Sequence, residues 1–107
     1  VLGCPCPICQ SQDAFNKRLR PSVLLKFDHK QLLVDAGPDF RLQALRQGIL
    51  TLDGVLLTHA HHDHTAGLDD LRPIYYRRTS PLPILLSAST AEDVKMRYYY
   101  LFRSTYE

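Results

Sequence analysis

The stretch LLTHAHHDHTAGLDD, residues 56–70, places four histidines and one aspartate within six positions. It continues the apolar run GVLLT (residues 54–58), which has the length and composition of a buried strand. Only His29 adds another histidine to the chain. Imidazole nitrogens and carboxylate oxygens are the usual ligands of zinc and other divalent metals, whereas a solvated loop needs no such density of them. We therefore predict a metal site at the end of this strand.

The spacing of the donors predicts two pairs of ligands. Side chains in extended chain repeat every two residues, so His59 and His61 point to one side. A bend would carry Asp63 and His64 to a second point, so that one loop supplies two ligands to each of two metals roughly 3.5–4 Å apart. His62 lies between the pairs, and we expect it to face solvent. A single histidine would more often be packed or simply exposed; five donors in six positions argue against that alternative.

The segments on either side of this loop predict an α/β fold. SVLLKF (22–27) and QLLVD (31–35) flank Asp28-His29-Lys30 and predict a hairpin, and PILLS (83–87) predicts another buried strand. We expect helices over residues 38–47 with Gly48 as the stop, over 65–76 at least in part, and from a capping box at 89–92 to about residue 103. This alternation is typical of a sheet with helices packed against it, in which sites form at the carboxyl ends of strands.

Composition indicates an ordinary globular domain, or part of one. The chain has 107 residues, 45% of them hydrophobic and 22% charged, with a formal net charge of +2. That charge is too small to indicate a nucleic-acid or membrane surface, and no apolar stretch approaches the roughly 18 residues of a membrane span. We see no signal peptide at residues 1–4.

Residues 1–20 read as a loop that carries all three cysteines. Cys4, Cys6 and Cys9 form C-x-C-x-x-C, an odd and tight cluster that makes a poor disulfide framework and a better metal clip. We expect a structural Zn²⁺ there and a reducing cytoplasm as the compartment. Three reduced thiols, or a disulfide between two of them, are the alternatives.

These motifs together resemble the metallo-β-lactamase superfamily. THAHHDHTAGL (58–68) is similar to its H-x-H-x-D-H signature, and LLVDAGPDFR (32–41) to its second strand and Asp-bearing turn. GCPCPIC (3–9) and AGLDDLR (66–72) resemble the phosphoribosyl cyclic phosphodiesterase branch, near relatives of ribonuclease Z. The resemblance implies the α/β class, as half of an αββα sandwich with a mixed sheet and flanking helices.

The resemblance also implies roles for individual residues. His59 and His61 would hold the first metal, and Asp63 and His64 the second, the ions being zinc or manganese. Asp63 would also be catalytic, near the attacking water. Asp35 would orient the metal loop from behind its ligands; the alternative is a carboxylate that caps the following helix.

The superfamily takes further ligands from its second half, which we expect to lie beyond residue 107. After His64 there is no histidine, and the fourth ligand of the cysteine site would also come from that half, with His29 only a weak substitute. We interpret residues 1–107 as the N-terminal part of a single hydrolase domain and expect the coding sequence to continue past Glu107. The uncovered sheet would expose apolar surface, to be covered by the missing half or by a second copy.

The predicted activity is that of a metal-dependent hydrolase. A phosphodiesterase acting on a small phosphodiester or nucleotide-like substrate is the first hypothesis. Arg72, Arg77 and Arg78 could contact phosphate, although a solvated helix face explains them as readily. A thioester or lactam hydrolase of the same fold and a non-catalytic zinc-binding fragment are the alternatives.

Overall fold

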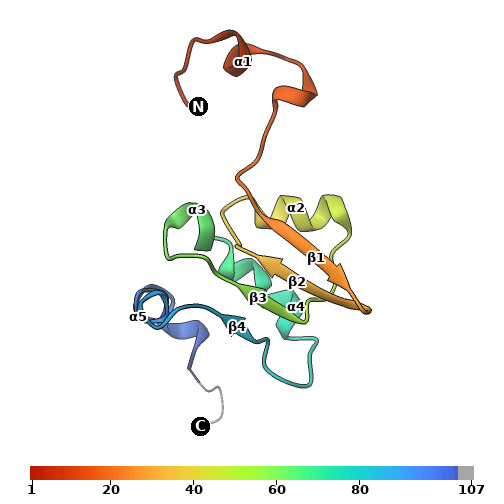
Figure 1. The fold of residues 1–107 in the computed structure, drawn as a ribbon, viewed down its shortest axis with the longest axis vertical. Helices are drawn as coiled ribbons and strands as arrows, with labels where there is room; N and C mark the ends of the chain where they lie inside the picture. Colours follow the sequence, from red (N-terminus) through yellow and green to blue (C-terminus); the bar gives the residue numbers. More distant parts are fainter. Residues whose placement is uncertain (104–107) are drawn as a thin grey trace.

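The computed structural model describes residues 1–103 and consists of one mixed sheet with helices on one of its faces (Figure 1). The strands are β1 (Val23–Phe27), β2 (Lys30–Val34), β3 (Gly54–Leu56) and β4 (Ile84–Leu85), in the sheet order β1-β2-β3-β4. β1 pairs antiparallel with β2, and the other two pairings are parallel. The predicted α/β class is confirmed. The helices are α1 (Pro7–Gln10), α2 (Phe40–Gln47), α3 (His62–Thr65), α4 (Arg72–Tyr75) and α5 (Ala88–Arg97), with 3-10 turns η1 (Ala14–Asn16), η2 (Leu68–Leu71) and η3 (Tyr99–Leu101).

The predicted hairpin is formed by β1 and β2, with a tighter turn than we expected. Lys30 already pairs with Phe27, so only Asp28 and His29 make the loop. Both have positive φ, 46° and 61°, as a two-residue turn between twisted strands requires. Aspartate tolerates this backbone better than most residues, which is why the turn forms without glycine.

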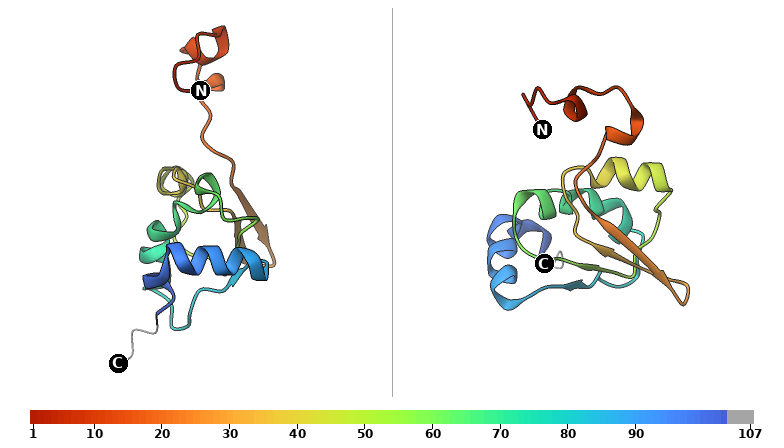
Figure 2. Two further views of the ribbon diagram at one scale, coloured as in Figure 1. Left: turned by 90° about the vertical axis from the view of Figure 1, so that its left-hand side faces the viewer. Right: turned by 45° about the horizontal axis from the view of Figure 1, so that its top comes forward.

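One face of the sheet carries the core. The register aligns Leu24, Leu33, Val55 and Ile84 in one row across the four strands. Leu33 and Val55 belong to the buried cluster that includes Phe40 of α2, and Leu24 and Ile84 pack against it. Figure 2 shows α2, α3 and α4 gathered on this side of the strands.

The opposite face of the sheet is apolar and uncovered among residues 1–103. The side chains that point there from the two edge strands are between 44% and 52% exposed: Val23, Leu25, Phe27 and Leu85. Leu32, Val34 and Leu56 continue this apolar face across β2 and β3 and are half-buried. Such a row is unusual on the surface of a soluble domain and indicates a surface that packs against something else.

The last two predicted helical regions agree with the structure in part. Residues 65–76, predicted to be helical at least in part, contain the end of α3, then η2 and α4, and α4 starts where Pro73, which lacks an N–H, fits the first turn of a helix. α5 begins after Ser87, whose hydroxyl accepts the N–H of Thr90 at 3.2 Å, so the predicted capping box at 89–92 is wrong by two residues. The helix ends at Arg97 and not near residue 103.

The N-terminal segment stands away from the sheet (Figure 1) and is tied back to α2. The N–H and guanidinium of Arg20 contact the carboxylate of Asp39 at 2.8 and 3.2 Å, and Gln43 donates to the carbonyl of Arg20 at 2.8 Å. The N–H of Arg20 lowers the pKa of Asp39 most strongly. Burial raises this pKa slightly, but the Arg20 guanidinium lowers it further, so it stays below its usual value. Residues 1–20 also contain α1 and η1, where we expected loop throughout.

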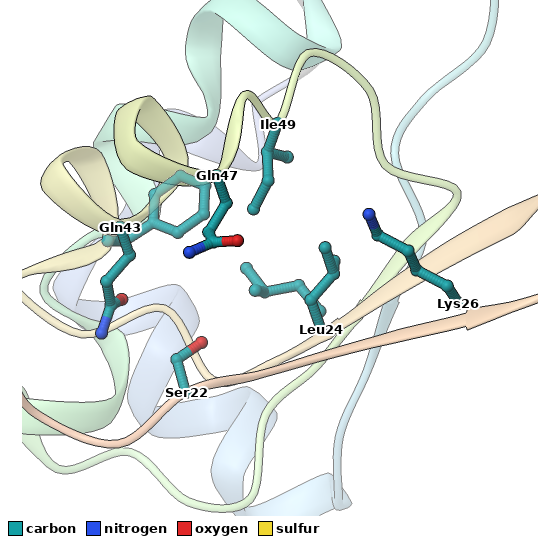
Figure 3. Close-up of a pocket in the computed structure, with 8 residues that line it drawn as sticks. Ser22, Leu24, Lys26, Gln43, Gln47 and Ile49 are labelled. Carbon is teal, nitrogen blue, oxygen red and sulfur yellow. The ribbon is translucent and has the colours of Figure 1, made fainter.

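A groove of about 370 Å³ lies between β1 and α2 (Figure 3). Its floor is apolar, and its rim carries Ser22, Lys26, Gln43 and Gln47. None of its lining residues belongs to the histidine loop. Within residues 1–103, no helix is long and apolar enough to cross a membrane.

Candidate metal centre

The histidine loop (residues 58–64) follows β3 and enters α3, at the carboxyl end of the parallel strands. The ring centroid of His59 lies 4.6 Å from that of His61 and 4.1 Å from that of His64. Three of the four imidazoles therefore gather around His59, whereas His62 is exposed as expected. The loop thus brings the predicted histidine ligands together.

Asp35 lies behind this loop and is 5% exposed. Its Oδ1 accepts the N–H of Thr58 at 2.8 Å, and its Oδ2 lies 2.8 Å from the Thr58 hydroxyl and 2.7 Å from Nδ1 of His64. Burial disfavours the charged form, but hydrogen bonds from the Thr58 N–H, the His64 ring and the Thr58 hydroxyl outweigh it and hold the pKa of Asp35 below its usual value. A carboxylate only accepts, so Nδ1 of His64 carries a hydrogen and Nε2 points away from Asp35.

The alternative role that we considered for Asp35, capping the next helix, is not what the structure shows. The N-cap of α2 is Asp39, and among the described residues the carboxylate of Asp35 accepts from Thr58 and His64. Asp35 itself has φ of 61°, a strained backbone of the kind that clusters at functional sites.

Two glycines that we had not singled out let the Asp35 turn touch the histidine loop. A Cβ on Gly37 would lie 2.1 Å from the carbonyl oxygen of Asp63, and one on Gly67 would lie 2.2 Å from the carbonyl oxygen of Gly37. Ala36 joins the same contact, since its N–H donates to His64 at 2.9 Å and its carbonyl accepts from Gly67 at 2.8 Å. The D-x-G pattern of residues 35–37 was the signal in the sequence that could have revealed Gly37.

The ligand atoms of the loop do not form one compact set. Nε2 of His64 faces Oδ2 of Asp63 at 3.3 Å. In neutral His64 both of these atoms carry lone pairs, so either a proton or a cation between them would make the approach favourable. Within residues 1–103, no three donors of the histidine loop have ligand atoms that all lie within 4.8 Å of one another. The loop donors are therefore at most a half-built site, and a metal held by them would need further ligands.

The cysteine triad does form a compact set. The sulfurs of Cys4, Cys6 and Cys9 lie within 4.8 Å of one another and are free thiols, so the disulfide alternative is not observed. The N–H of Cys9 and the neighbouring thiols of Cys4 and Cys9 lower the pKa of Cys6 to about 7. Thiolates are the ligands of structural zinc, so the triad could supply three of the four ligands of such an ion. His29 is not part of this cluster.

The arginines have structural partners. Arg77 and Arg78 donate to the carbonyls of Leu50 and Leu52, at 3.4 and 2.6 Å, and Arg72 pairs with Asp69 at 3.4 Å. Arg97 on α5, which we did not predict, donates to the carbonyl of Ala60 at 2.8 Å. It ties α5 to the middle of the histidine loop.

Comparison with known proteins places this site in a family. Residues 30–106 match the family model described as the beta-lactamase superfamily domain. A crystal structure described as a new diphosphatase from the PhnP family superposes with a TM-score of 0.87 at 42% identity, covering 92% of this chain and 40% of that one.

Two curated relatives carry different names. A ribonuclease Z of Methanopyrus kandleri is 43% identical over 48% of this chain and 19% of its own length. An octanoyltransferase of Porphyromonas gingivalis is 46% identical over 95% of this chain but only 20% of its own length. The chain thus spans about a fifth of each of these two relatives.

Proposed function

The chain belongs to the beta-lactamase superfamily domain family, that is, to the metallo-β-lactamase superfamily, and from that membership we propose that it forms part of a metal-dependent phosphodiesterase. The network around Asp35 carries the proposal, because it turns Nε2 of His64 away from the core toward Asp63. Relatives described as ribonuclease Z and as a diphosphatase support the choice of a phosphate ester or anhydride as substrate class. The substrate that we propose is a small phosphodiester or nucleotide-like molecule.

Each loop residue has a proposed role toward two divalent ions, zinc or manganese. His59 and His61 would hold the first ion, and Asp63 and His64 the second. When bound, such ions supply a water of near-neutral pKa and positive charge for the phosphoryl oxygens. Asp63, more exposed than His64, would also accept a hydrogen bond from the attacking water and orient it.

Proposed partners follow from the half-built site and the uncovered apolar face. Residues 1–107 would be the N-terminal part of one hydrolase domain, in which residues 1–20 carry a structural zinc on the cysteine triad. The remaining ligands and a cover for Val23, Leu25 and Phe27 would come from a C-terminal half, or from a second copy of the chain. Free thiols favour a reducing cytoplasm as the compartment.

The octanoyltransferase name does not carry a second proposal. The match spans a fifth of that protein, and the name does not say which part transfers octanoyl groups.

Hydrolysis of bis-p-nitrophenyl phosphate and of 2′,3′-cyclic nucleotides by the full-length protein, with added Mn²⁺ or Zn²⁺, tests the proposal. H59A and H64A should abolish turnover, whereas H62A, at the exposed histidine, should retain most of it. Thioester and lactam substrates run in parallel would identify the other hydrolases of this fold. Two tightly bound metals without phosphodiester turnover would refute the phosphodiesterase, and the absence of metal binding would favour a non-catalytic module.

A further inference from the structure

Thr58 lies between the buried carboxylate and the first histidine of the loop. Its hydroxyl oxygen is 2.8 Å from Oδ2 of Asp35 and 3.0 Å from Nδ1 of His59. Its N–H also donates to Oδ1 of Asp35, at 2.8 Å, which fixes the residue on the carboxylate by both backbone and side chain. One threonine therefore connects the end of β2 with the histidine that follows β3.

The valence of each group assigns the protons along these contacts. A carboxylate has no hydrogen to give, and a hydroxyl has one hydrogen and two lone pairs. The hydrogen of Thr58 must therefore point to Asp35, and the oxygen of Thr58 can only accept from His59. Nδ1 of His59 then carries the hydrogen, and in a neutral ring Nε2 is bare.

We propose that Thr58 is a positioning residue: its hydroxyl donates to Asp35 and accepts from His59. This holds the His59 ring in the Nδ1–H tautomer, with Nε2 free to bind a cation. His64 is held in the same tautomer by direct contact with the same carboxylate. One buried aspartate thus orients a histidine of each proposed ligand pair, the first through a hydroxyl and the second directly.

The effect on metal binding rests on the proposed function, whereas the tautomer does not. A ring that carries its hydrogen on Nε2 must lose or move it before that atom can bind a metal. Partners behind a ligand of this kind typically change metal affinity about 10- to 100-fold. Valine matches threonine in shape and lacks the hydroxyl, and serine keeps the hydroxyl, so the two variants separate hydrogen bonding from packing.

Long-range ¹H–¹⁵N correlation spectra of the imidazoles in the metal-free protein test the tautomer directly. We expect His59 as the Nδ1–H form in the wild type and in T58S, and a shift toward the Nε2–H form in T58V. An Nε2–H ring at His59 in the wild type, or an unchanged ring in folded T58V, would overturn the proposal. If T58V fails to fold, the wild type and T58S still decide it.

Titration with Zn²⁺ and Mn²⁺ by calorimetry gives the second measurement. T58V should bind the first ion about 10-fold more weakly or worse, T58S should restore the affinity, and T79V, at an exposed threonine, should leave it unchanged. Equal affinity of T58V and wild type would overturn the proposal. A full-length protein that binds no metal would refute the proposed function, while the spectra would still decide the role of Thr58.

Discussion

Replacing Gly37 with alanine should displace the histidine loop by a distance that follows from the structure. The added Cβ would lie 2.1 Å from the carbonyl oxygen of Asp63, a separation that Cβ atoms do not tolerate. Backbone must move by roughly 1 Å to restore contact distance, and a clash in a tight core costs about 1–3 kcal/mol. Because the obstructing atom is main chain and not a flexible side chain, we expect the upper end of that range.

The same displacement should weaken metal binding as well as the fold. Misplacement of a site by about 1 Å can reduce function roughly 100-fold. Gly48 provides the matched control: it has φ of 63° and nothing within 4 Å of its added Cβ. G48A should lower the free energy of unfolding by about 1 kcal/mol through backbone strain alone and leave metal affinity unchanged.

Urea unfolding and Zn²⁺ titration of G37A and G48A measure both quantities. Wild-type affinity in folded G37A, or an equal loss of affinity in G48A, would refute the reasoning that the close approach of the Gly37 and Asp63 backbones fixes the position of the histidine loop.

Three further outcomes are expected. D35N should lower the free energy of unfolding by roughly 2–3 kcal/mol, because an amide has one oxygen and cannot replace both carboxylate oxygens that face Thr58 and His64. Urea unfolding without metal measures the loss, and a change below about 0.5 kcal/mol would contradict this role of Asp35. Since the folded-state pKa of Asp39 is lowered, its contact with Arg20 is present above the ordinary aspartate pKa and is lost as pH falls through the lowered value. The protection factor of the Arg20 amide should therefore fall in acid and in D39A, and an unchanged protection factor in D39A would argue against the contact. L25K should reduce binding of a dye specific for apolar surface and change stability by less than about 0.5 kcal/mol, because Leu25 is 44% exposed; a loss of several kcal/mol would mean that this face is already covered.

Much of the fold was predictable because the signals were local. The hairpin, β3 and the carboxyl-end position of the histidine loop follow from runs of apolar residues and from turn chemistry, both of which depend on near neighbours. The predicted start of α5 was wrong because Ser87 and Ser89 both suit an N-cap. Strand β4 ends at Leu85, so Ser87 is the first of the two serines after it and caps the helix. The helical content of residues 65–76 was predicted, but not its division into α3, η2 and α4, because a proline can also start a helix and only packing decides where it does so.

The candidate site was predictable in its residue types and only in part in its supports. The density of donors in residues 59–64 predicted a metal centre, and the resemblance of residues 32–41 to the metallo-β-lactamase superfamily implied a supporting role for Asp35. Nothing local indicates that Gly37 and Gly67 touch, since they lie thirty residues apart. Arg97 reaches Ala60 from a different helix, and such a contact exists only once the chain is folded.

The left-handed backbone at Asp35 restricts which residues can replace this aspartate. Glycine would relax the chain and discard the carboxylate, asparagine would keep the conformation and discard the charge, and glutamate would keep the charge on a residue less suited to that conformation. No one-step replacement preserves both properties. A lineage that loses this aspartate should therefore regain it by reversion, or else abandon the histidines that depend on it.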